Sequence, residues 1–165
     1  MPIMIHNIEI LPAKPSDAEE ILEIYRSLIG LQGCVWDEHY PTIEFVRRDI
    51  ENGCLFKAVV DGKTAGAAYC GDYEEQQLLE CFEGAKKLGE FGRVGVRREF
   101  HRMGVARALL GFLKNNAKER GYDAVSLLVS RNNHGAIALY EDLGFKKVGE
   151  SELYDNEWYC YLCHL

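Results

Sequence analysis

Predicted strands and helices alternate along most of this 165-residue chain, and this order is the feature that most restricts its fold. Helices carry apolar residues at three- and four-residue intervals, whereas strands alternate or form short apolar runs. The observed order predicts an α/β (α+β) fold, a mixed sheet with helices packed on it. The expected strands are 5–11, 55–60, 63–70, 91–96, 124–129, 145–153 and 158–163, and the expected helices are 16–30, 42–51, 104–120 and 135–143.

Polar and glycine residues mark several ends of these elements. Ser16 followed by Glu19 predicts a capping box at the start of the first helix, and Thr42 is placed to cap the second. The dipeptide Asp61-Gly62 lies between two apolar runs and predicts a hairpin. Residues 72–88 carry the weakest pattern, with a further helix expected over Glu74–Phe82.

The bulk properties predict one domain, residues 1–165, with an ordinary globular composition. The net charge of −7 argues against nucleic acid as a partner, because phosphate binding needs a basic surface. No apolar run approaches the ~20 residues needed to cross a bilayer, so no membrane association is expected. The first residues lack a basic segment followed by an apolar one, and we therefore expect a cytoplasmic location. The sequence does not choose between a monomer and a homodimer.

Six cysteines are scattered along the chain, and free thiols are the expected state. Cys160-Tyr-Leu-Cys163-His164 matches the pattern of covalent haem attachment. However, it lies in a predicted strand, where residues three apart point to opposite faces. We therefore expect neither haem nor a metal site.

The segment Phe91–Leu110 reads as a strand, a short polar loop and the start of a helix. Small residues at Gly104 and Ala106 leave the first helical turn accessible, and the first four N–H groups of a helix lack internal partners. The helix dipole also favours negative charge there, so this segment suits a phosphate. Four arginines raise the local positive potential: Arg97, Arg98, Arg102 and Arg107. The alternative is a capped amphipathic helix with solvated arginines.

A second segment, Ser130–Phe145, has Asn133 in position to cap the helix that follows it. Ile137 and Tyr140 are three residues apart and share a face of that helix. The alternative role for Tyr140 is that of a half-buried core aromatic.

Together the two segments resemble motifs A and B of the GNAT superfamily of N-acetyltransferases. The resemblance rests on the strand ending at Val96, the loop at 101–106, and the Asn-x-x-Ala-x-x-x-Tyr-x-x-x-Gly-Phe pattern at 133–145. It covers nearly the whole chain and implies a mostly antiparallel sheet of about seven strands, with about four helices on its two faces. His101 and Arg102 depart from the usual Arg or Gln and Gly of the family, which shifts the expected phosphate contacts to the backbone around Gly104.

The resemblance implies that acetyl-CoA is a co-substrate, with its pantetheine arm along the strand that ends at Val96. Tyr140 would be the general acid that protonates the departing thiolate, since its phenol is neutral near pH 7. Asn133 would contact the cofactor near the arm. The implied cofactor-binding residues are Val94, Gly95, Val96, His101, Arg102, Met103, Gly104, Val105, Ala106, Arg107, Asn133 and Tyr140.

The acceptor amine must lose a proton, and Glu90 is the first candidate base because it begins the cofactor strand. The alternative for Glu90 is an exposed carboxylate at a strand edge. Asp37, Glu38 and His39 are weaker candidates. The aromatic residues expected to line the acceptor pocket are Trp36, Tyr40 and Tyr154. A small-molecule amine or amino acid is favoured over a protein acceptor, and a non-catalytic acyl-CoA sensor is the competing hypothesis.

Overall fold

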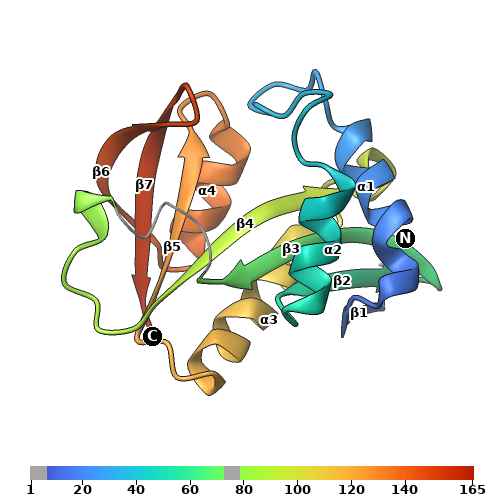
Figure 1. Ribbon diagram of the computed structural model, residues 1–165, viewed down its shortest axis with the longest axis horizontal. Helices are drawn as coiled ribbons and strands as arrows, with labels where there is room; N and C mark the ends of the chain where they lie inside the picture. Colours follow the sequence, from blue (N-terminus) through green and yellow to red (C-terminus); the bar gives the residue numbers. More distant parts are fainter. Residues whose placement is uncertain (1–6, 73–78) are drawn as a thin grey trace, which may run out of the picture.

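The computed structural model of the chain, which describes residues 7–72 and 79–165, contains a seven-stranded sheet in the order β1-β2-β3-β4-β5-β7-β6 (Figure 1). Neighbouring strands are antiparallel except β4 and β5, which are parallel. The strands are β1 (Ile8–Pro12), β2 (Leu55–Val60), β3 (Lys63–Gly71), β4 (Leu88–Val96), β5 (Ala124–Ser130), β6 (Lys146–Leu153) and β7 (Asn156–His164), and the α-helices are α1 (Ala18–Ser27), α2 (Ile43–Glu51), α3 (Val105–Glu119) and α4 (His134–Asp142). The predicted order of elements and the predicted fold class are confirmed.

Helices cover both faces of the sheet, and each face has its own apolar core. Side chains of α1 and α2, among them Ile21 and Val46, pack with Leu55 and Tyr69 on one face. The helices α3 and α4 pack on the other face, where Leu109, Leu110 and Phe91 are buried. Within the described residues, no helix is both long and apolar enough to span a membrane.

Local sequence accounts for several element boundaries. The Thr42 hydroxyl accepts a hydrogen bond from the Phe45 amide at 3.4 Å, so the predicted cap of α2 is confirmed. Asp61 and Gly62 both have positive φ angles and connect β2 to β3 as predicted. In the turn between β6 and β7, positive φ angles fall on Tyr154 and Asp155, the backbone that a two-residue hairpin turn requires.

Two local predictions differ from the structure, and two fall partly outside the described residues. The Ser16–Glu19 capping box is wrong, because Pro15–Asp17 form a 3₁₀ turn and the Asp17 carboxylate accepts the Lys14 amide at 2.7 Å instead. Of the helix expected over Glu74–Phe82, residues 74–78 lie outside the described residues and Glu80–Phe82 form a 3₁₀ turn. Likewise Ile5 and His6 of the first expected strand lie outside them.

The parallel strands β4 and β5 pair over only three residues each, Leu88–Glu90 with Ala124–Ser126. Beyond Glu90, β4 stays paired with β3, and β5 stays paired with β7. The two halves of the sheet therefore part toward one end of the molecule. At this end lie the α1–α2 loop (residues 28–42) and the β6–β7 turn, which face each other across the opening (Figure 1).

Candidate active site

Two cavities lie at the end of the molecule where β4 and β5 part. The larger, about 600 Å³, is lined by the α1–α2 loop, by both parted strands and by the β6–β7 turn. The smaller, about 470 Å³, lies between the C-terminal end of β4, the N-terminal end of α3 and the N-terminal end of α4. Four residues line both cavities: Val94, His101, Asn133 and Tyr140. The two spaces therefore adjoin at this junction.

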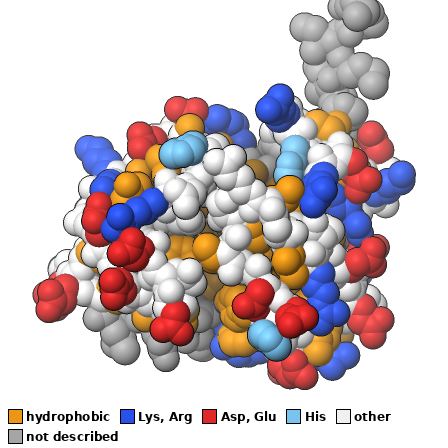
Figure 2. Space-filling view, turned by 90° about the horizontal axis from the view of Figure 1, so that it is seen from above, with side chains coloured by type: hydrophobic (Ala, Val, Ile, Leu, Met, Phe, Trp, Pro, Cys, Tyr) orange, Lys and Arg blue, Asp and Glu red, His pale blue; other side chains and the backbone are white. Residues whose placement is uncertain are grey.

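The walls of the larger cavity are mostly apolar and aromatic. Trp36 and Tyr40 line it from the α1–α2 loop, and Tyr154 and Trp158 from the β6–β7 hairpin. Figure 2, which looks onto this end of the molecule, shows hydrophobic side chains near the middle of the face and charged ones around its margin. The predicted acceptor residues Trp36, Tyr40 and Tyr154 are thus brought together, although 114 positions separate Tyr40 from Tyr154 in the chain.

The smaller cavity is lined by the N-terminal end of α3. Gly104 is the N-terminal cap residue with φ +82°, and a Cβ placed on it would meet nothing within 4 Å. The N–H groups of the first turn, from Val105 onward, have no partners within the helix, and the dipole of this 15-residue helix adds positive potential. Arg102 and Arg107 also line the cavity. These residues fit a phosphate group.

Most of the predicted cofactor residues line the two cavities, with two exceptions. Gly95 faces α1, since a Cβ on it would lie 2.9 Å from the Tyr25 ring. Met103 packs against the apolar core. The His101 ring lies 2.7 Å from the Val96 carbonyl oxygen, a contact that closes the loop between β4 and α3.

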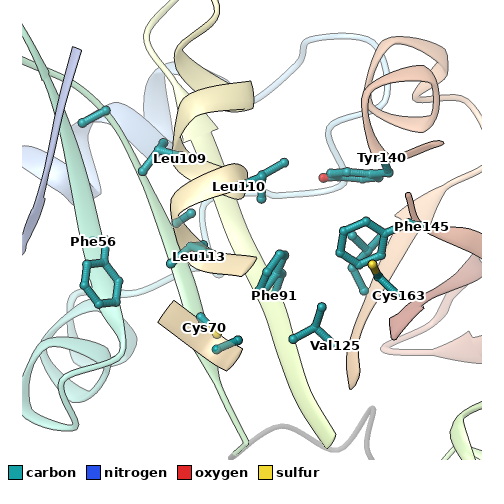
Figure 3. Close-up of a cluster of buried hydrophobic side chains, with 14 of the residues drawn as sticks. Phe56, Cys70, Phe91, Leu109, Leu110, Leu113, Val125, Tyr140, Phe145 and Cys163 are labelled. Carbon is teal, nitrogen blue, oxygen red and sulfur yellow. The ribbon is translucent and has the colours of Figure 1, made fainter. Parts of the chain in front are cut away.

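Tyr140 is a core aromatic and also a cavity residue. Its side chain is only 8% exposed and packs on Phe145, with ring centroids 6.1 Å apart. The ring extends from α4 toward Leu110 with its hydroxyl at the leading end (Figure 3). Burial raises the pKa of the phenol to about 12, so the neutral, proton-donating form is strongly favoured near pH 7. Asn133 caps α4 by accepting the Ala136 amide at 3.2 Å, which confirms its predicted capping role.

Glu90 lies apart from both cavities. The alternative of an exposed edge carboxylate is wrong, because β4 is an interior strand and Glu90 has 0% exposure. Its carboxylate accepts a hydrogen bond from the Tyr69 hydroxyl at 3.2 Å. Of the other carboxylates considered, Asp37 lines the larger cavity.

Sequence reasoning missed Arg93, which lines the larger cavity from β4. Its side chain is buried and forms a bidentate pair with Asp49 of α2, with distances of 2.6 Å from Nε and 3.0 Å from Nη2. The signal was present as a charged residue inside an apolar strand, because a buried charge needs a partner. The identity of that partner, 44 positions away, is not readable from spacing.

Metal ligation has no visible basis in the part of the chain that the structure describes, where no group of three or more His, Cys, Asp or Glu side chains is clustered. Cys160 and Cys163 are buried in β7, and His164 is exposed at its end.

The accessible, anion-suited end of α3 thus lies beside an apolar cavity, in a sheet that parts between β4 and β5. Residues 19–145 match the family model of the acetyltransferase (GNAT) family, and the chain belongs to this family. It is therefore an acyltransferase.

Known relatives agree with this assignment. The chain is 31% identical to an N-alpha-acetyltransferase of Saccharolobus solfataricus, over 82% of this chain and 78% of the relative. It is 26% identical to a thialysine N-epsilon-acetyltransferase of Caenorhabditis elegans, over 88% of each. A third relative, the probable N-acetyltransferase camello of Xenopus tropicalis, is 28% identical, and the chain spans 58% of its length.

Solved structures share the fold. The yncA protein of Salmonella typhimurium, solved with its cofactor acetyl-CoA, superposes with a TM-score of 0.77 at 20% identity, covering 96% of this chain and 94% of that one. A ribosomal-protein-alanine N-acetyltransferase of Brucella melitensis gives a TM-score of 0.76 at 21% identity, covering 95% and 99%.

Proposed function

We propose that this protein transfers the acetyl group of acetyl-CoA to a primary amine by direct attack of the amine on the thioester. The observation that carries the proposal is the junction of the two cavities at Val94, His101, Asn133 and Tyr140. One cavity has the groups that suit a pyrophosphate, and the other has walls that suit an organic acceptor. A thioester at the junction would face an amine in the larger cavity, and such alignment supplies much of the rate of a two-substrate reaction.

Residues of β4 and α3 would hold the cofactor. The backbone of Val94 and Val96 would pair with the amides of the pantetheine arm, because β5 leaves β4 beyond Glu90. The first turn of α3, from Gly104 to Arg107, would bind the pyrophosphate through its N–H groups. Asn133, at the junction, would contact the arm.

Tyr140 would donate its proton to the departing thiolate. Burial raises the pKa of the phenol to about 12, so Tyr140 carries the proton near pH 7 and can donate it, or a hydrogen bond, to the thiolate. An amine of pKa near 10.4 costs about 4–5 kcal/mol to neutralise at pH 7, so a base that takes its proton would also accelerate the reaction.

Two carboxylates compete for the role of base. Asp37 lines the larger cavity and would reach the amine directly or through water. Glu90 would act only through intervening groups, since Tyr69 lies over its carboxylate and the Arg93 guanidinium lies 4.5 Å from the Tyr69 ring centroid. Comparing the acid limb of the kcat/KM pH profile in Asp37→Asn and Glu90→Gln would separate the two.

The acceptor we propose is a small amine or amino acid with an apolar body. The larger cavity offers the Trp36 and Trp158 rings for that body, and its buried charged pair, Arg93 with Asp49, is internally neutralised. Two of the relatives are named for the acetylation of amines, one at an N-alpha and one at an N-epsilon position.

Free thiol release from acetyl-CoA, measured with a panel of amines, tests the proposal. We expect acceptor-dependent release that falls at least about tenfold in Tyr140→Phe. A matched control is Tyr161→Phe, which removes a hydroxyl bonded to Glu141 at 3.0 Å and should leave kcat within about twofold. Acetyl-CoA binding without release for any amine would favour the acyl-CoA sensor, and no binding would reject both.

A further inference from the structure

The strand β4 contains one extra residue opposite β3, at Arg93. Between the pairs Tyr69–Gly92 and Ala67–Gly95, β3 has one residue and β4 has two. Arg93 has a φ of +44°, a backbone conformation that a residue with a side chain rarely adopts. In regular alternation Arg93 would share the face of Phe91, which packs in the apolar core beneath α3. The bulge turns the guanidinium to the opposite face, where α2 lies.

On that face the Arg93 guanidinium is held on several sides. Asp49, whose side chain is 1% exposed, receives two hydrogen bonds in a fork that fixes the plane of the guanidinium. The ring of Tyr69 lies 4.5 Å away and the ring of Phe45 lies 5.6 Å away. The direction of the remaining nitrogen, Nη1, is therefore set by the strand and by α2.

Nη1 of Arg93 donates a hydrogen bond of 2.8 Å to the hydroxyl of Tyr40. Tyr40 ends the loop segment 33–40, and its ring packs edge-on against Phe45 at 5.0 Å. At the start of the same segment, Gly33 approaches Asn133 so closely that a Cβ would lie 2.7 Å from the Asn133 Cβ. The loop is thus tied at one end to β4 and touches the start of α4 at the other.

We infer that Arg93, Asp49 and Tyr40 form a positioning unit, the Arg93 anchor, which sets the shape of the acceptor cavity from the strand that would carry the cofactor. The inference rests on the proposed function, since it assigns an acceptor-side role within that site. Arg93 and Tyr40 also line the acceptor cavity, but within the anchor each member is a positioning residue, because it acts on the loop that carries Trp36. Such a unit would keep the acceptor cavity aligned with the junction of the two cavities, where the thioester would lie.

Tyr40→Phe tests the anchor, since it removes one hydroxyl and keeps the ring on Phe45. Without the hydrogen bond from Arg93, segment 33–40 should leave its observed position for part of the time, and only the fraction of molecules with the segment in place would bind the amine well. We expect KM for the amine to rise about three- to tenfold, with kcat and acetyl-CoA affinity within about twofold. Hydrogen exchange of the loop amides of Cys34, Asp37 and His39 should accelerate.

Tyr122→Phe is the matched control. Tyr122 also lies beside an arginine, with the Arg120 guanidinium 5.3 Å from its ring, but it precedes β5 at the far end of the sheet. We expect neither the amine KM nor the loop exchange to change in this variant. A Tyr40→Phe protein with wild-type amine KM and wild-type exchange of residues 33–40 would overturn the inference.

The two proposals fail separately. If no amine in the panel causes the wild-type protein to release thiol from acetyl-CoA, the acetyltransferase proposal fails. Hydrogen exchange in Tyr40→Phe and Tyr122→Phe still decides the anchor, because it needs no turnover. Faster exchange confined to 33–40 in Tyr40→Phe supports the anchor, and equal exchange in both variants overturns it.

Discussion

Removing Asp49 should destabilise the protein more than any exposed ion pair could, because it leaves the Arg93 guanidinium buried without its carboxylate. The side chains of the pair are 4% and 1% exposed, and they share hydrogen bonds of 2.6 and 3.0 Å. Breaking a buried pair at one partner costs about 3–5 kcal/mol. For a chain of this length, that loss of unfolding free energy lowers Tm by about 6–20 °C.

A double-mutant cycle in urea unfolding measures the coupling between the two residues. Asp49→Ala should show the full loss, whereas Asp49→Ala combined with Arg93→Met should lose clearly less than the sum of the single changes, by about 2 kcal/mol. The reason is that the double variant contains no buried unpaired charge. Glu150→Ala is the control, since its pairs with Lys147 and Arg131 lie at the surface, and the urea midpoint should stay unchanged. Strict additivity in the cycle would refute the reasoning.

Three further predictions concern the two cavities. Gly104→Glu should abolish acetyl-CoA binding in calorimetry, since it places charge at the anion-suited helix end; unchanged affinity would reject that site. Gly33→Ala should raise the amine KM and lower Tm more than Gly30→Ala, because both glycines have φ near +90° but only Gly33 has a neighbour, Asn133, within 4 Å of the added Cβ. The pKa of Tyr140 lies near 12, above its unfolded value near 10, so its neutral form is kept and any loss of kcat from its ionisation should begin only as pH rises toward 12. A kcat decline between pH 8 and 10 that Tyr140→Phe removes would contradict this assignment.

Features that depend on neighbours in the chain were predictable. The caps Thr42 and Asn133 each act on an amide three residues away, so a short stretch of sequence specifies them. The exception is instructive: Ser16 has the residue type of a cap, but Pro15 starts a 3₁₀ turn and Asp17 takes over the local hydrogen bond. Two local solutions competed there, and spacing alone could not rank them.

The candidate site also contains features specified by neighbouring residues and features specified by distant ones. Gly104 and the first turn of α3 are contiguous, and a helix end suits anions whatever surrounds it, so this anion-suited segment was predictable from the sequence. Glu90 was read as the start of a strand and as a base, but its access to a substrate depends on which strands flank β4 and on the Tyr69 hydroxyl above it. The flanking strands and Tyr69 are all contributed by other parts of the chain, so the residues around Glu90 do not reveal them.

By itself the sequence determined the order of the elements, the helix end suited to phosphate and the tyrosine on the following helix, since each follows from the local backbone and from residues a few positions apart. Only the tertiary structure decided that Arg93 would turn onto the face of α2, meet Asp49 and hold Tyr40. A buried charge requires a partner, but any of the chain's 26 acidic residues could have served on sequence grounds. Packing decided the partner, because only the folded protein brings Arg93 within hydrogen-bond distance of Asp49, 44 positions away, and of Tyr40, 53 positions away.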